Sequence, residues 1–176
     1  DNTYFKMCQA RILFREKEYQ GSIDVFKQIA ARDSLPEVLA LIGDGYKNLG
    51  QNDSAIVYYE AVLRMKPYHA PTISKKADIM LAAKQYEPVA EMCHTYLAER
   101  PDDLTILPIY GLTRYLQERY AQSIQTFFHM QELGDDSYPV HYYLGMNYYS
   151  MNYWPDAIPE LEKAYQIDSS DVKLVY

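Results

Sequence analysis

The sequence predicts an all-α chain of about five stacked helix-turn-helix repeats, because residues of similar size recur at one fixed spacing and a helical pattern fills each interval. Small residues follow one another in steps of 34: Gly43, Ala77, Gly111 and Gly145. Large apolar residues repeat the same step: Tyr59, Cys93, Phe127 and Leu161. Prolines recur with it once, at Pro67 and Pro101. Agreement among three such series indicates true internal repetition.

The second repeat shows the expected elements most clearly. Apolar residues between Leu39 and Tyr46 recur every three or four positions, which is one face of an α-helix. Gly50 then favours a helix end. We expect a second helix with Asp53 as its N-cap, and Pro67 prevents that helix from continuing. No segment alternates with the period of two that predicts a strand.

The same pattern divides the whole chain, residues 1–176, into one array. The predicted repeats cover approximately 3–35, 36–69, 70–103, 104–137 and 138–171, and residues 172–176 are expected to begin a further or capping helix. In the last repeat, Pro155 and Pro159 both lie near the start of the second helix. We expect that helix to begin with Asp156 as its N-cap, because Pro159 then falls in the first turn, where no backbone donor is needed.

The small-residue series has a packing explanation. Stacked helical hairpins bury one continuous core, and small side chains let neighbouring helices approach closely. A large side chain at such a position should overpack, whereas a change at an outward position such as Gln131 should be tolerated. The series is Ala10, Gly43, Ala77, Gly111 and Gly145.

These residues resemble the tetratricopeptide-repeat pattern, W-x2-L-G-x2-Y followed by A-x3-F and P within 34 residues. The second repeat matches it at Leu39, Ile42, Gly43, Tyr46, Ala55, Tyr59 and Pro67. The fifth repeat matches it well, with His141 at the tryptophan position, and the fourth departs from it at Arg114, where tyrosine is expected. The resemblance implies a right-handed superhelical solenoid. It is specific for fold and unspecific for function.

In that family the first helix of each hairpin lines the concave surface. The resemblance implies that the inward residues lie six and three before the small position, and one and four after it. The polar inward positions of the second and third repeats include Asp44, Lys47 and Asp78. The inward set of the fourth and fifth repeats is mostly apolar and aromatic: Thr105, Pro108, Leu112, Tyr115, Pro139, Tyr142, Met146 and Tyr149. The first repeat contributes Tyr4, Met7, Arg11 and Phe14.

The inward surface is therefore expected to be charged in its N-terminal half and aromatic in its C-terminal half. Family members that bind a partner's C-terminal carboxylate use Lys and Asn at positions held here by Ala40, Asp44, Ser74 and Asp78, which disfavours that mode. An apolar patch at Leu112, Tyr115, Tyr142, Met146 and Tyr149 suits a hydrophobic peptide or helix. Alternatively, a sixth repeat, a capping helix or a dimer mate covers the patch.

Catalytic, cofactor and metal sites are not expected. No two of the four histidines have the helical spacing of a zinc-ligand pair: His69, His94, His129 and His141. Phosphate-binding and nucleophile-elbow motifs are absent. Cys93 occupies the large apolar position, so a buried structural thiol is favoured over a nucleophile. The acidic pairs Asp102–Asp103 and Asp135–Asp136 are expected to cap the helices that follow them.

Charge and composition narrow the partners. A net charge of −7 disfavours a nucleic-acid backbone or an anionic membrane surface as the ligand, and no apolar run reaches the roughly 20 residues of a membrane span. We therefore expect a scaffold for a protein or peptide partner. The alternative is a structural or oligomerisation segment of a larger protein, including a homo-dimer formed through the C-terminal repeat. A disulfide between Cys8 and Cys93 is not expected, since distant repeats hold them.

Overall fold

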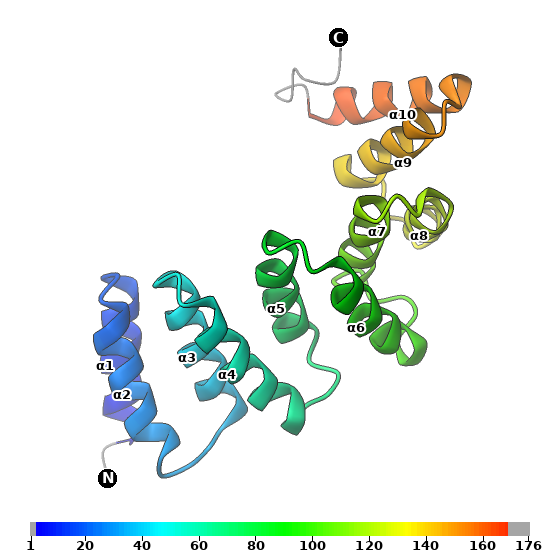
Figure 1. Ribbon diagram of the computed structural model, residues 1–176. Helices are drawn as coiled ribbons and strands as arrows, with labels where there is room; N and C mark the ends of the chain where they lie inside the picture. Colours follow the sequence, from blue (N-terminus) through cyan, green and yellow to red (C-terminus); the bar gives the residue numbers. More distant parts are fainter. Residues whose placement is uncertain (1–2, 169–176) are drawn as a thin grey trace. The chain divides into compact units, whose positions relative to one another are not determined.

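The computed structural model describes residues 3–168, and that part of the chain contains ten α-helices and no strand (Figure 1). The helices follow one another as five hairpins, so the predicted all-α repeat architecture is confirmed. Residues 172–176, where a further helix was expected, lie outside the described residues. The chain divides into two compact units, Asp1–Ile79 and Met80–Tyr176, and each is described by itself.

The first unit holds the first two hairpins and most of a fifth helix. Within it α2 packs on α1 and on α3, and α4 packs on α3. The boundary with the second unit falls in the last turn of α5. The bounds are α1 Thr3–Arg15, α2 Tyr19–Ala30, α3 Pro36–Asn48, α4 Asn52–Met65 and α5 Ala70–Ala82.

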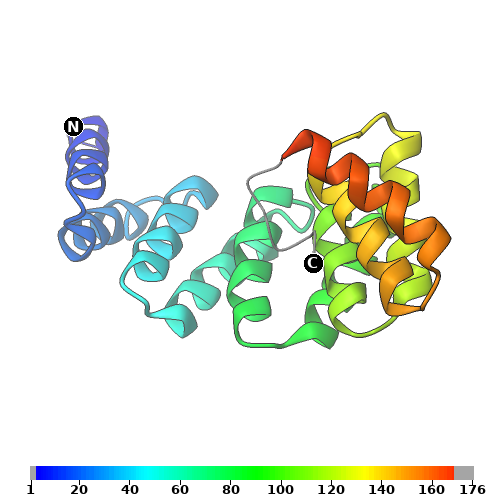
Figure 2. The ribbon, with the colours of Figure 1, turned by 90° about the horizontal axis from the view of Figure 1, so that it is seen from above.

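The second unit holds the remaining helices. Here α7 packs on α6 and α8, α9 packs on α8, and α9 and α10 lie side by side in both views (Figures 1 and 2). Helix α7 is only ten residues long and begins three residues after the expected repeat boundary, since Pro108 fits only a first turn. The bounds are α6 Tyr86–Glu99, α7 Leu107–Leu116, α8 Tyr120–Glu132, α9 Tyr138–Ser150 and α10 Trp154–Ile167.

One backbone turn recurs inside all five hairpins. The second residue after the end of each first helix has a positive φ, between 58° and 72°. The next residue donates its N–H to the carbonyl five positions earlier, at 2.9 Å in every repeat, which is a Schellman motif. Only the second repeat has glycine at the left-handed position; the five residues are Lys17, Gly50, Lys84, Glu118 and Asn152.

This turn also fixes where each second helix begins. In every repeat the second helix starts two residues after the left-handed position. The expectation that Asp53 caps α4 was therefore wrong: Gln51 is the N-cap and Asp53 lies in the first turn. The late start expected for the last helix was also wrong. Helix α10 begins at Trp154, and Pro159 lies inside it, because the turn at Asn152 sets the start before the prolines can.

Glycines are needed where the first helix of a hairpin meets the second. A Cβ placed on Gly43 would lie 2.6 Å from the ring of Tyr59, and one on Gly111 would lie 2.7 Å from the ring of Phe127. On Gly145 the same atom would lie 2.6 Å from Leu161. In each case the opposing side chain belongs to the large apolar series. The small-residue series and the large apolar series therefore recur together because their members contact each other directly.

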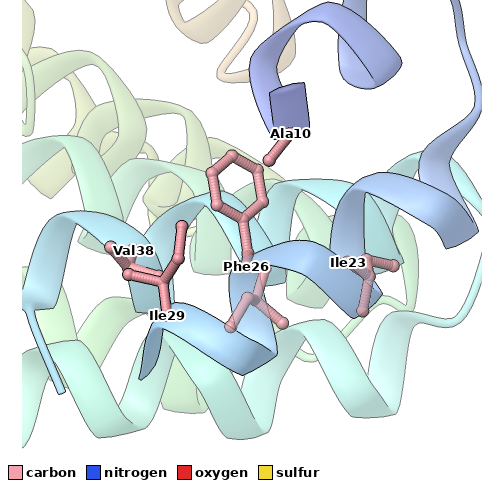
Figure 3. Close-up of a cluster of buried hydrophobic side chains, with 6 residues drawn as sticks. Ala10, Ile23, Phe26, Ile29 and Val38 are labelled. Carbon is pink, nitrogen blue, oxygen red and sulfur yellow. The ribbon is translucent and has the colours of Figure 1, made fainter. Parts of the chain in front are cut away.

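The first hairpin has alanine at the equivalent position. Figure 3 shows Phe26 directed at Ala10, with Ile23, Ile29 and Val38 around it, and all five are buried. Hydroxyls strengthen two of the hairpins, because Ser22 Oγ donates to the Ala10 carbonyl at 2.8 Å and Ser123 Oγ donates to the Gly111 carbonyl at 2.9 Å.

Replacing Gly111 with Leu should lower the melting temperature far more than a Leu substitution on the surface. The new side chain has no room beside Phe127, so overpacking of roughly 1–3 kcal/mol or more is expected. Gln125→Leu on the exposed side of α8 is the matched control. Gln131, which the sequence suggested as an outward position, is not a suitable control because it is half-buried and its Nε2 lies 3.5 Å from His141 Nδ1. Equal shifts in the two thermal melts would contradict this packing.

Glu118→Gly should stabilise the second unit. Glu118 has φ 59°, a conformation that costs side-chain-bearing residues energy and glycine almost none. After the extra backbone entropy of glycine is subtracted, we expect a gain of roughly 0.5–1 kcal/mol. Glu118→Ala is the control, because alanine keeps the strain and removes only the carboxylate. Urea denaturation of the three proteins measures the difference, and a gain shared by Glu118→Ala would assign it to charge instead.

Candidate functional site

Inward positions of the first unit come together around a hollow of about 580 Å³. Phe14, Asp44 and Lys47, all expected from the sequence to face inward, line it together with Asn48 and Lys75. Neither Asn48 nor Lys75 was expected to face inward. Each directly follows an inward position, Lys47 or Ser74, and the long side chain of Lys75 reaches Asp44.

Ion pairs occupy the charged groups of this hollow. Lys47 Nζ lies 2.9 Å from Asp78 Oδ2, and Lys75 Nζ lies 2.7 Å from Asp44 Oδ2. The Tyr59 hydroxyl donates to Asp44 Oδ1 at 2.8 Å, and burial, followed by this hydrogen bond, raises the pKa of Tyr59 well above its usual range. Because both lysines already face a carboxylate, the hollow does not present a free cationic pair to an anionic ligand. Exposed pairs of this kind contribute little to stability.

Aromatic rings connect the inward positions of the second unit. Tyr143 is the centre of the group: its ring centroid lies 5.7 Å from that of Tyr115 on α7 and 5.0 Å from that of Tyr142 on α9. It also stacks on Phe127 at 5.3 Å with an interplanar angle of 14°. Tyr138 stacks on Tyr142 at 5.5 Å. We call these five residues, together with Tyr120, which contacts Tyr115 at 5.9 Å, the aromatic cluster.

The structure brings Tyr115 and Tyr142 together through a residue that sequence reasoning missed. Tyr143 lies two positions before Gly145, outside the inward set, and only its contact with Phe127 reveals its role. Burial raises the pKa of Tyr143. Leu112 and Met146 are half-buried, and Tyr149 is 50% exposed and packs edge-on against Trp154 at 4.8 Å. No charged side chain occupies the inward positions of these two repeats.

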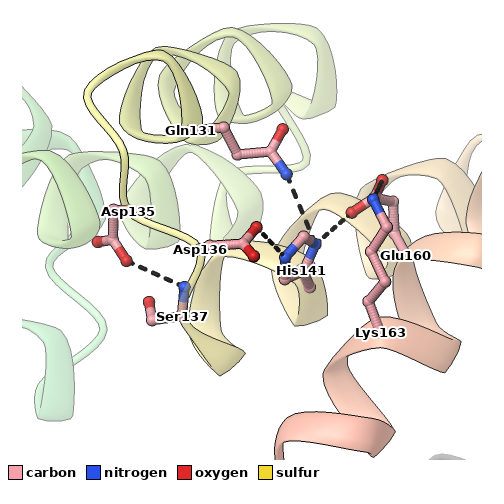
Figure 4. Close-up of polar contacts among 7 residues, drawn as sticks. All are labelled: Gln131, Asp135, Asp136, Ser137, His141, Glu160 and Lys163. Atoms are coloured by element: carbon pink, nitrogen blue, oxygen red, sulfur yellow. Dashed lines mark hydrogen bonds and ion pairs between the residues drawn. The ribbon is translucent and has the colours of Figure 1, made fainter.

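His141 forms a buried polar centre between α9 and α10 (Figure 4). Its side chain is 1% exposed, with Nε2 2.7 Å from Asp136 Oδ1 and Nδ1 2.5 Å from Glu160 Oε2. Which ring nitrogen donates and which accepts depends on the tautomer of the imidazole. Asp136 thus binds the histidine and does not cap α9, while Asp135 accepts the Ser137 backbone N–H at 3.1 Å. This polar group links α9 to α10 within the last hairpin.

The acidic pair Asp102–Asp103 does not make the contacts expected of helix-capping residues. Asp102 Oδ1 lies 2.8 Å from His129 Nε2, and Asp103 accepts hydrogen bonds from the Thr105 N–H at 2.8 Å and from the Tyr96 hydroxyl. The N-cap of α7 is Ile106, with no side-chain hydrogen bond. The expectation that this pair caps α7 was therefore wrong, and Asp103 orders the loop before the helix.

Comparison with known proteins identifies one of the repeats and the fold. The profile of the tetratricopeptide-repeat family matches residues 36–69, the second repeat. The second repeat is therefore a tetratricopeptide repeat. A solved structure of MamA from Desulfovibrio magneticus RS-1, residues 41 to the end, is 20% identical with a TM-score of 0.83 and 97% of each chain covered. A double mutant of MamA RS-1 gives 21% identity, a TM-score of 0.84 and 98% coverage of each chain.

A further MamA crystal structure is 14% identical, with a TM-score of 0.81, 99% of this chain and 96% of that chain covered. At these identities the likeness is one of fold, which agrees with the five hairpins derived above. No curated protein sequence matches the chain. Tetratricopeptide repeats are generally non-catalytic scaffolds for protein partners, and this protein has their architecture.

Arg114 is the main departure from the tetratricopeptide-repeat pattern inside the second unit. It is only 8% exposed, and its hydrogen-bond partners are neutral: Nη1 donates to Gln117 Oε1 at 2.9 Å and Nη2 donates to the Tyr110 hydroxyl at 3.0 Å. The guanidinium also lies 4.8 Å from the Tyr110 ring centroid, and its Nε has no hydrogen-bond partner. Cation–π contact with Tyr110 therefore takes the place of a carboxylate.

Cys93 is a core residue, as expected. It is fully buried and, like Cys8, is a free thiol. Burial raises the pKa of the Cys93 thiol from its ordinary value of 9.0 to about 12, and the charge of Arg114 opposes part of that rise. Within residues 3–168, no group of three His, Cys, Asp or Glu side chains is arranged to hold a metal ion. None of the described helices is long and apolar enough to cross a bilayer.

At pH 8 iodoacetamide should modify Cys8 in the folded protein and leave Cys93 untouched. With a pKa of about 12, only about one Cys93 thiol in 10⁴ is ionised at that pH, and the residue is inaccessible. Because the folded pKa is raised, the thiol supports folding fully below pH 9, and this contribution is lost as the pH rises from 9 towards 12. Mass spectrometry of tryptic peptides checks the first point. Rapid labelling of Cys93 under native conditions would contradict its burial.

Proposed function

We propose that the protein is a non-catalytic scaffold that binds a peptide or helical segment of another protein on the inward positions of its first helices. The proposed contact residues in the second unit are Leu112, Tyr115, Tyr142, Met146 and Tyr149. Asp44, Lys47 and Asp78 are the proposed polar contacts in the first unit. The observation that carries the proposal is the uncharged inward surface of the fourth and fifth repeats, where Tyr115 and Tyr142 both touch Tyr143.

The aromatic cluster supports this role because its rings are already held in place. Tyr143 rests on Phe127, which is fully buried beside Gly111. Rings fixed in this way lose little conformational freedom when a partner binds, so more of the contact free energy remains as affinity. Tyrosine is also among the residues that dominate the binding energy of protein interfaces.

Replacing Tyr142 and Tyr149 with Ala should weaken partner capture strongly and lower the melting temperature only a little. Aromatic anchors often contribute about 2 kcal/mol or more each to binding, whereas Tyr149 is half exposed and Tyr142 half-buried. Thermal melts and quantitative pull-down with wild-type and mutant bait measure the two effects.

Tyr153→Ala/Tyr165→Ala, which removes two exposed tyrosines of the same repeat, is the matched control. We expect it to retain capture. A large loss of stability in the Tyr142/Tyr149 variant with unchanged capture would instead indicate that the patch is covered within the protein or by a second copy.

A second candidate function is self-association through the C-terminal repeat, and the outer surface of α10 favours it. Ile158 is 55% exposed and Tyr165 is 44% exposed. The residue one repeat before Ile158, Ile124, packs instead against the core of the second unit. Ile158 is thus exposed at a position whose equivalent one repeat earlier is partly buried. Exposed apolar side chains of this kind are suited to packing against another helix.

Ile158→Glu should therefore abolish any dimer while the fold is retained. A buried, unpaired carboxylate in an apolar contact is strongly unfavourable, and the same carboxylate is harmless on a solvated surface. Sedimentation velocity over a range of concentrations measures the association, with Val57→Glu on exposed α4 as the control. A wild-type protein that stays monomeric at all concentrations would exclude this candidate.

A further inference from the structure

Two exposed rings meet at right angles where α9 ends and α10 begins. Tyr149 and Trp154 have centroids 4.8 Å apart and an interplanar angle of 88°. They are 50% and 46% exposed, so each presents much of its surface to solvent although the two touch. Trp154 follows the left-handed turn at Asn152 by two residues, so the turn that closes the hairpin also fixes the position of the indole beside Tyr149.

Two polar side-chain groups in the first turn of α10, the indole N–H of Trp154 and the carboxylate of Asp156, have no hydrogen bond or ion pair with another described residue. No described side chain or carbonyl accepts a hydrogen bond from the indole N–H of Trp154, which can only donate. Asp156, exposed in the first turn of α10, forms no ion pair within residues 3–168. The site therefore offers two apolar ring surfaces, a hydrogen-bond donor and a negative charge.

This combination suits an extended backbone better than a helix. A polyproline II segment has no internal hydrogen bonds, so its carbonyls remain free to accept from an indole N–H, and its pyrrolidine rings pack on aromatic surfaces. A helix has already used its carbonyls internally. The unpaired Asp156 adds charge complementarity to a basic residue that flanks such a segment.

The spacing of the inward tyrosines is compatible with the same ligand. Tyr142 and Tyr149 are seven residues apart on α9, which corresponds to about 10.5 Å along the helix axis. One turn of polyproline II advances about 9.3 Å, so prolines three positions apart can each reach one of the two rings.

We propose that the Tyr149–Trp154 pair binds a proline-rich segment in the polyproline II conformation, with an Arg or Lys outside the proline core of the segment that is attracted by Asp156 in the same first turn of α10. This inference rests on the proposed function, since Tyr149 belongs to the inward row, and it names the chemistry of the partner. Trp154 contributes ring surface and a donor, Tyr149 the perpendicular ring, and Asp156 the selection for a basic flank.

Trp154 is the only tryptophan in the chain, so its fluorescence reports directly on the site. The probe is a polyproline peptide of about ten residues that ends in Arg, titrated into the whole 176-residue protein. A saturable blue shift of the emission is expected, because the peptide excludes water from the indole. A Gly-Ser peptide of the same length with the same Arg should produce no shift.

Variants separate the parts of the site. Tyr149→Ala should weaken binding at least tenfold, and Tyr149→Phe, which keeps the ring, should stay within about threefold of the wild type. Asp156→Asn should remove the preference for the Arg peptide over a matched Glu peptide. Tyr165→Ala, an exposed tyrosine elsewhere on α10, is the control and should bind as the wild type does. Circular dichroism melts of all four variants ensure that affinity is compared between folded proteins.

The inference is overturned if the polyproline peptide causes no shift at millimolar concentration, or if Tyr149→Ala and Tyr165→Ala bind equally well. An amphipathic helical peptide that binds with dependence on Tyr142 while polyproline does not would overturn it as well, yet leave the proposed function intact. If neither peptide binds, and the Tyr142→Ala/Tyr149→Ala variant captures partners as well as the wild type does, the proposed function is overturned too.

Discussion

The close approach of the two helices in each hairpin is the constraint on which the rest of this protein depends. Gly43, Gly111 and Gly145 leave no room for a Cβ, because a ring or leucine of the partner helix fills that space. Each hairpin can then bury a large side chain completely, as Tyr59 and Phe127 show. A core made in this way grows by repetition, since every hairpin offers its neighbour the same kind of surface.

The proposed binding surface in the second unit depends on that same contact. Phe127 fits beneath Gly111, Tyr143 stacks on Phe127, and Tyr115 and Tyr142 pack around Tyr143. The exposed rings are therefore connected to the core through an unbroken series of aromatic contacts. The polar residues are arranged differently in the two units. In the first unit, lysines and aspartates form ion pairs around a hollow, and in the second unit His141 contacts two carboxylates while Arg114 donates to Gln117 and Tyr110.

The turn inside each hairpin keeps the same backbone geometry although the residue at its left-handed position differs between repeats. All five hairpins share a left-handed residue and a 2.9 Å Schellman hydrogen bond, although only Gly50 and, less readily, Asn152 are suited to that conformation. Lys17, Lys84 and Glu118 accept the strain because the packed helices on both sides determine the path of the chain. The same requirement holds Pro159 inside α10, where its missing N–H would otherwise favour a later start.

The sequence by itself determined the number of hairpins, their period, the two packing series and the burial of Cys93, because helical periodicity and side-chain size are local properties that repeat along the chain. The inward positions of Asp44 and Tyr115 stay a prediction from the register. Only the tertiary structure decided which groups meet: Lys75 with Asp44, Tyr143 with Phe127, and Trp154 with Tyr149. These contacts join different helices, and their partners depend on the exact rotation and spacing of packed elements, which periodicity leaves open. The starts of α4 and α10 were likewise decided by the turns at Gly50 and Asn152, because each second helix begins two residues after the left-handed position.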